Sequence, residues 1–191
     1  MHKLTPQDVY PPRIYEAMRQ ELRESIIREK RVRRIALGPD VSVVFENRAT
    51  MIFQVCEMLR AEHIAEPAKI QEEIDVYNSL LPEPGELAAT LFVEITRSED
   101  IRPSLHRLLG IEEHVALEVA GERIPALFEA GRSDEERISS VQYVRFRPSE
   151  AARVALSTPG ASVGLVCDLP SYTYRVELGG DARASLASDL A

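Results

Sequence analysis

The stretch LPEPGE at residues 81–86 divides the chain into two halves with different hydrophobic patterns. Two prolines and a glycine within six residues interrupt any helix or strand. Before this stretch apolar residues recur mostly at helical spacing, whereas after it apolar and polar residues alternate as in strands. The pattern predicts an α+β fold: a helical N-terminal half with a β-hairpin, followed by a mostly antiparallel sheet with covering helices. We expect a single domain over residues 1–191, with a division into a helix-rich region (residues 1–82) and a strand-rich region (residues 83–191) as the alternative.

The N-terminal half carries the signals of several helices and one hairpin. Asn47 is a good N-cap for the helix that follows it, and Pro67 opens another, because proline fits the first turn of a helix. Gly38-Pro39-Asp40 indicates a turn between two short apolar runs, which predicts the hairpin. The expected elements of this half are helices beginning at Thr5, Arg13, Arg48 and Pro67, and strands at residues 32–37 and 41–45.

The C-terminal half contains several short runs in which apolar and polar residues alternate, a pattern typical of half-buried strands. Between them lie short segments with helical spacing. The expected elements are strands at residues 87–96, 114–120, 140–146, 162–167 and 172–178, and helices at residues 101–109, 148–156 and 181–190.

The charge of the chain is unevenly distributed. The formal net charge is -8, yet residues 1–34 hold nine Lys and Arg against five Asp and Glu. The acidic remainder is a poor non-specific binder of nucleic acid, so no nucleic-acid partner is expected. The basic stretch REKRVRR at residues 28–34 is expected to pair with this acidic body. Binding of an acidic partner or of RNA is the alternative, although no aromatic cluster accompanies the stretch.

Cysteine usage and hydropathy bear on the cellular compartment. Cys56 and Cys167 lie far apart in apolar runs and are expected to be two buried thiols rather than a disulfide. The N-terminus has no apolar core of the signal-peptide type, and no apolar run is long enough to span a membrane. We therefore expect a cytoplasmic protein without a membrane partner. The sequence is also compatible with a homo-oligomer.

Sequence motifs for several common chemistries are missing. The chain has no G-x-x-x-x-G-K-[ST] or G-x-G-x-x-G phosphate loop and no C-x-x-C pair. Its four histidines form no H-x-x-x-H pair, and none follows a glutamate at the spacing of a di-iron helix. The sequence therefore predicts no cofactor, and it leaves open whether the protein is an enzyme.

The first candidate site lies at the junction between the second expected strand and the helix that follows it. Free backbone N–H groups and the positive end of the helix dipole meet there, and both favour an anion. The candidate ligand-binding residues are Glu46, Asn47, Arg48 and Gln54. The alternative is structural: Asn47 caps the helix, Arg48 is solvated and Glu46 pairs locally.

The next helix supplies the candidate catalytic residues. Gln54, Glu57 and Arg60 are spaced by three and share one side of the helix. Glu57 is the candidate general base, with Arg60 or Arg48 holding an anionic substrate. The alternative is an ordinary surface pair of Glu57 with Arg60. A broader hypothesis joins Glu46, Arg48, Glu57 and Arg60 in one charged network between the hairpin and the helices.

No motif indicates a metal, but some side chains are candidate ligands. Glu72 and Asp75 are three apart on a helix, and Glu57 could approach from the neighbouring helix to hold Mg²⁺ or Mn²⁺. His63 is a further candidate. The alternative is that the acids form a solvated helix face and that His63 is a favourable charge at a helix end.

Several stretches carry a family resemblance. These are LTPQDVYPPRIYEAMR near the start, RRIALGPDVSVVFENRATMIFQVCEMLRAEHI, IQEEIDVYNSLLPEPGELAATLFVEI and the closing ARASLASDL. With them the whole chain resembles an uncharacterised bacterial family, domain of unknown function 3501 (DUF3501). The resemblance implies no established reaction. It does imply an association with rubrerythrin-like and iron–sulfur oxidoreductase proteins, and hence a setting of redox chemistry or oxidative stress.

Three kinds of function are consistent with these observations. The leading hypothesis is an accessory or binding protein that acts with a redox partner through its surface. The alternatives are an enzyme of unfamiliar type that uses a Glu base and Arg anion-binding groups, and a carboxylate metal-binding protein. A deep pocket converging on Glu57 and the arginines would favour the enzyme, whereas a flat apolar patch rimmed by polar residues would favour the binding protein.

Overall fold

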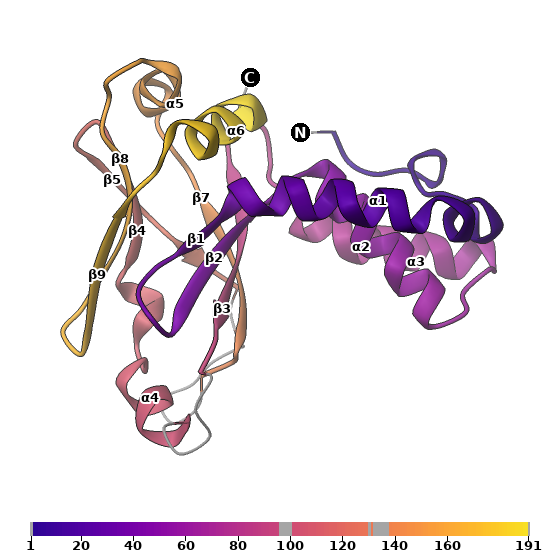
Figure 1. Cartoon of the computed structure of the whole chain (residues 1–191), viewed down its shortest axis with the longest axis horizontal. Helices are drawn as coiled ribbons and strands as arrows, with labels where there is room; N and C mark the ends of the chain where they lie inside the picture. The colour runs from indigo at the N-terminus through magenta and orange to yellow at the C-terminus, as the bar shows by residue number, and fades with distance from the viewer. Residues whose placement is uncertain (1, 96–100, 130, 132–137, 191) are drawn as a thin grey trace.

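The computed structural model describes residues 2–95, 101–129, 131 and 138–190, which form two lobes (Figure 1). One lobe is a pair of packed β-sheets, here called the sandwich. The other is a projecting bundle of three helices, here called the arm. The arm consists of α1 (Pro12–Arg33), α2 (Arg48–Ala61) and α3 (Pro67–Leu80), preceded by a 3-10 turn at Pro6–Asp8.

The sandwich is built from two antiparallel sheets. The first has the order β1-β2-β3-β7-β6, with strands Arg34–Ala36, Val41–Glu46, Leu87–Val93, Val141–Phe146 and Leu127–Phe128. The second has the order β5-β4-β8-β9, with strands Glu122–Pro125, Val115–Val119, Val163–Leu169 and Tyr172–Glu177. Helices α5 (Glu150–Ser157) and α6 (Gly180–Leu190) lie at one end of the sandwich, and α4 (Ile101–Arg107) lies at the other (Figure 1).

The main hydrophobic core lies between the two sheets. Alternate residues of each strand point into it, because successive side chains of a strand face opposite sides. Val43 and Phe45 of β2 belong to this core together with Leu117 of β4 and Leu165 of β8. All six residues of β2 are nevertheless buried, so its other face is covered as well. The cover comes from the side of the arm, and this arrangement places Glu46 at the junction of the two lobes.

The arm has a smaller core of its own. Tyr15 of α1, Val55 and Leu59 of α2, and Ile74 of α3 are at most 4% exposed and pack with Leu4 near the N-terminus. Burial raises the pKa of the Cys56 thiol in this core and of the Cys167 thiol in the other. Both cysteines are free and buried, as the sequence predicts.

The α+β fold is confirmed, with corrections to its details. The predicted hairpin forms, but β2 also pairs with β3, so the hairpin belongs to the first sheet rather than to the helical half. The strands form two sheets instead of one, and the short strands β5 and β6 were not predicted. Val32 lies in α1, because that helix continues to Arg33. Within the described residues, no helix is both long and apolar enough to cross a membrane.

Candidate functional site

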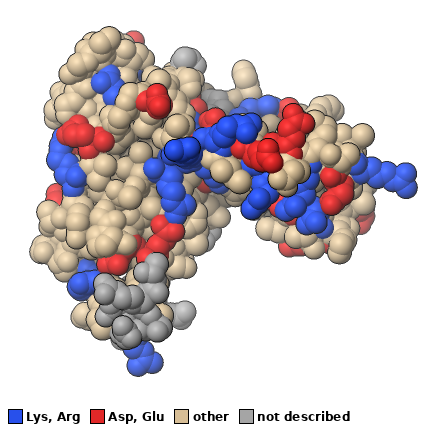
Figure 2. Space-filling view, viewed as in Figure 1, with Lys and Arg blue, Asp and Glu red and all other residues tan. Residues whose placement is uncertain are grey.

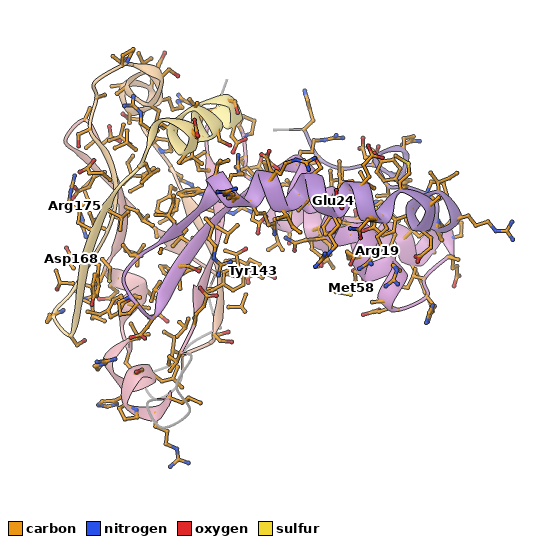
Figure 3. All side chains as sticks on the ribbon, viewed as in Figure 1. Arg19, Glu24, Met58, Tyr143, Asp168 and Arg175 are labelled. Atoms are coloured by element: carbon orange, nitrogen blue, oxygen red, sulfur yellow. The ribbon has the colours of Figure 1, made fainter. Side chains whose placement is uncertain are left out.

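A groove runs along the arm between α1 and α2 and has a volume of about 740 Å³. We call it the arm groove. Figure 3 labels Met58, one of its residues, on the arm. The groove is lined by Arg23, Ile26, Ile27, Lys30, Arg31, Arg34, Phe53, Gln54, Glu57, Met58, Arg60, Ala61 and Tyr77.

Helical spacing explains why these residues share one groove. Arg23, Ile27 and Arg31 are each four apart on α1, so they lie on one face of that helix. Gln54 and Met58 follow the same rule on α2. The long helix α1 and the shorter α2 pack along each other, and their facing edges form the two walls.

The floor of the groove is apolar. It contains Ile26, Phe53 and Met58, which are partly buried, and Ile27, which is 52% exposed. Tyr77 of α3 adds an aromatic ring, and burial is the main cause that raises the pKa of its hydroxyl. An open apolar surface of this kind is typical of an interaction site.

Five basic side chains surround this floor, and Figure 2 shows Lys and Arg gathered along α1. Three of them have acidic partners: Lys30 Nζ lies 3.4 Å from Glu46 Oε1, Arg60 Nε lies 2.9 Å from Glu16 Oε2, and Arg34 pairs with Glu94. Among the residues that the structure describes, Arg23 and Arg31 form no ion pair. Within the described part of the chain, the groove therefore presents two guanidinium groups without an internal counter-ion.

Glu57 is an acidic residue in the lining of the arm groove, and its carboxylate accepts three hydrogen bonds. Arg19 donates to it through Nε at 2.7 Å and Nη2 at 2.8 Å, and the Tyr15 hydroxyl donates at 2.6 Å. The bond from Arg19 is the main cause that lowers the pKa of Glu57 from 4.5 to about 2. A carboxylate so acidic is a poor proton acceptor near neutral pH. The geometry therefore gives no support to a general-base role.

Glu46 and Gln54, two of the predicted ligand-binding residues, do come together. Gln54 Nε2 and Lys30 Nζ each lie 3.4 Å from Glu46 Oε1, and Thr90 Oγ1 donates to the same oxygen at 3.2 Å. Glu46 is only 2% exposed, and its Oε2 has no hydrogen-bond partner among the described residues. Gln54 thus lies in the arm groove, next to a buried carboxylate.

Asn47 and Arg48 are placed away from the groove. Asn47 caps α2, since its side chain accepts from the Thr50 amide at 3.0 Å while the Thr50 hydroxyl accepts from the Asn47 amide. Arg48 pairs with Asp8 at 2.5 Å, and this hydrogen bond is the main cause that lowers the pKa of Asp8 to about 2. The structural alternative holds for Asn47, and the anion-binding role of these two residues remains a prediction.

The single charged network is wrong. No hydrogen bond or ion pair joins any two of Glu46, Arg48, Glu57 and Arg60, all of which the structure describes. Each instead pairs with a side chain from another element, and three of the four partners come from α1. The reason is that α1 lies across the arm and presents its own charges to α2, which the spacing within α2 does not reveal.

Comparison with known proteins gives the family. The family described as a protein of unknown function (DUF3501) matches residues 3–190. The chain belongs to this family. It is also similar to a crystal structure from Burkholderia pseudomallei described as a novel protein of unknown function, with a TM-score of 0.91, 31% sequence identity and complete coverage of both chains. The comparison with curated proteins gives no match.

The candidate metal ligands of this DUF3501 family member are not assembled. Over residues 2–95, 101–129, 131 and 138–190, no three His, Cys, Asp or Glu side chains are close enough to hold a metal ion together. Glu72 and His63 are exposed, and the Asp75 carboxylate accepts from Gln71 on its own helix at 2.8 Å. The structure therefore does not bring the candidate ligands Glu57, Glu72 and Asp75 together.

Sequence reasoning missed the main residues of the groove. It did not single out Ile27, which with Arg23 and Arg31 repeats every four residues on one face of α1. That repeat is the signal that could have found the groove. A second pattern, GASVG at residues 160–164, matches the G-x-S-x-G of many hydrolases. Here it leads into β8, whereas a nucleophile elbow joins a strand to a following helix, so Ser162 is not in that setting.

Proposed function

We propose that this chain is an accessory protein that binds a protein partner through the arm groove. One observation carries the proposal: an open apolar floor lies beside Arg23 and Arg31, which have no ion-pair partner among the described residues. Apolar area supplies affinity for a partner, and unpaired charge at its edge supplies orientation and speed of association.

The occupant that fits this groove best is an acidic amphipathic helix of the partner. Helices bind in grooves by laying an apolar face on the floor, with anchors at positions i, i+3, i+4 and i+7. Carboxylates on the flanks of such a helix would pair with Arg23 and Arg31. The rest of this chain is acidic, so the basic groove differs from the surface around it and favours an acidic partner over other proteins.

The redox character of the partner belongs to the proposal and comes from the family resemblance. Oxidoreductases of the rubrerythrin-like or iron–sulfur type carry their own metal centres. In this scheme the metal chemistry belongs to the partner, and this chain contributes a docking surface. The proposal is thus of a companion in redox metabolism rather than of a catalyst.

The experiment is a quantitative pull-down from the native host with the double variant R23E/R31E. The matched control is R13E/R28E, which reverses two exposed arginines of the same helix that do not line the groove. We expect a stoichiometric oxidoreductase to be recovered with wild type and with the control, and at least tenfold less of it with R23E/R31E. Equal recovery with both variants, or no oxidoreductase with wild type, would overturn the proposal.

Size-exclusion chromatography with light scattering adds a second readout. We expect the purified chain to be monomeric and to gain mass only when the identified partner is added. Self-association that R23E/R31E abolishes would show that the groove binds another copy of this chain, and the proposed partner would then be wrong.

A further inference from the structure

A second hollow lies on the other side of Glu46, between the arm and the outer face of the first sheet. It has a volume of about 410 Å³, and we call it the sheet pocket. Its lining includes Met51 of α2, Leu80 of α3, Thr90 of β3, Tyr143 of β7 and Leu127 of β6. Glu46 completes this wall from the end of β2.

Strand pairing explains why the pocket is open at this position. Glu46 pairs with Ala88, and Ala88 pairs with Arg145, so the three lie in one row across the sheet. The middle position of that row holds only a methyl group. In the next row, Thr90 lies beside Tyr143. The small side chain next to Glu46 leaves room above the sheet that the arm does not fill.

The Glu46 carboxylate is the unusual group of this pocket. Oε1 receives three long contacts of 3.2 to 3.4 Å, whereas the buried Oε2 has no protein partner among the described residues. Leaving a buried carboxylate oxygen unpaired is costly, so native structures provide such atoms with a donor. A group that donates strongly to Oε2 from the pocket would remove this cost.

The basic side chains of the lining do not supply that donor. Arg145 Nη1 lies 3.1 Å from Glu86 Oε2, and Arg147 Nε lies 2.5 Å from Glu86 Oε1. Glu86 is largely buried and engages both guanidinium groups. Lys30 reaches only Oε1, from the groove side. No basic side chain among the described residues therefore serves Oε2, and Glu46 is one of the residues that line the sheet pocket.

We propose that the sheet pocket binds a small molecule with a primary ammonium group on an apolar body. The ammonium donates to Glu46 Oε2 in a charge-assisted hydrogen bond, which is stronger than a bond from a neutral donor. Met51, Leu80 and Leu127 receive the apolar body, and the Tyr143 ring adds an aromatic surface. The wall combines these apolar side chains with polar ones, and such a combination of apolar surface and a few placed polar groups is usual in a small-molecule site.

The test is isothermal titration calorimetry with phenethylamine as the probe. The wild-type chain is expected to bind it with a dissociation constant of about 1 mM or tighter, the range for a ligand of this size. The probe 3-phenylpropanoate has the same apolar body with a carboxylate in place of the amine, and it is expected not to bind. Equal binding of the two probes would overturn the proposal.

Two variants locate the binding. E46Q keeps the shape of the side chain but removes its charge, and we expect phenethylamine to bind roughly tenfold or more weakly. L127W fills the pocket at a residue that is 40% exposed and leaves Glu46 intact, and we expect it to abolish binding. E150Q makes the same chemical change on α5, outside the pocket, and is expected to bind as wild type.

The outcomes separate this proposal from the proposed function. R23E/R31E should bind phenethylamine as wild type does, because neither arginine lines the sheet pocket. Loss of partner recovery with unchanged amine binding would leave both proposals standing. Absence of amine binding to wild type, or undiminished binding to E46Q, would mean that Oε2 is served by solvent alone. The pocket proposal would then be wrong whatever the groove binds.

Discussion

Glu57 shows how far a single side chain of the arm depends on another helix. Arg19 lowers the pKa of Glu57 to about 2, below its ordinary value of 4.5. A depressed pKa contributes stability above the ordinary value, and this contribution is lost as the pH falls from about 4.5 to about 2. Both side chains are 30% exposed, so screening by water limits the contribution to about 1 kcal/mol.

Replacement of Arg19 tests this pair. In R19M we expect the pKa of Glu57 to rise toward 4.5, measured by carboxyl NMR titration. The free energy of unfolding should fall by about 1 kcal/mol at pH 7 and change less at pH 2.5, where wild type has already lost some of the interaction. R13M, which removes an exposed arginine of the same helix, should leave the titration of Glu57 unchanged. An unshifted pKa in R19M would show that Tyr15 or solvent holds the carboxylate instead.

The start of α2 is the element that ties the hairpin to the arm. Asn47 lies between the last residue of β2 and the first residue of α2. Its side chain caps α2 by accepting from the Thr50 amide, and its Nδ2 donates to Glu29 of α1 at 2.8 Å. N47A should therefore lower the free energy of unfolding by about 1–2 kcal/mol in urea titrations. N47S keeps an acceptor for the Thr50 amide and should recover some of this loss. Equal stability of N47A and wild type would contradict the capping role.

Signals carried by neighbouring residues were sufficient to predict most elements. The cap at Asn47, the proline at Pro67 and the turn at Gly38 each act within a few positions of the backbone they shape. Strands β5 and β6 were missed because they are four and two residues long, too short for a periodic pattern. The division into two sheets follows from pairings between distant strands, which local patterns do not specify.

In the candidate site, too, contacts between residues near in sequence were predicted and contacts between distant residues were not. Gln54 and Glu46 are eight residues apart across a strand–helix junction, and the sequence placed both in one candidate group. The partners of Glu57 lie 38 and 42 residues away on α1, so nothing near Glu57 in the sequence indicates them. The helix spacing gave the correct face of α2 but the wrong partner for Arg60.

At the scale of the whole molecule, α1 belongs to both lobes, and Arg33 at its end fastens them. Sequence analysis expected the basic stretch at residues 28–34, which includes Arg33, to pair with the acidic body, and the Arg33 side chain is only 1% exposed. It donates to the carbonyl of Phe45 at 2.8 Å and to that of Glu46 at 3.2 Å. It also donates to Ser185 at 2.7 Å and pairs with Asp189, both on α6. One guanidinium thus joins the arm, the first sheet and the C-terminal helix.

Removal of Arg33 should therefore destabilise the whole molecule and not the arm alone. Burial already raises the pKa of Asp189, and without Arg33 that carboxyl would lie largely buried without its ion-pair partner. Breaking a buried pair in this way costs about 3–5 kcal/mol, so R33M should lower the free energy of unfolding by that amount in urea titrations. R33M/D189L removes both charges and should recover some of the loss. R28M, at an exposed position of the same helix, should stay within about 0.5 kcal/mol of wild type. If R33M were as stable as R28M, the attachment of the arm would depend on apolar contacts and not on this guanidinium.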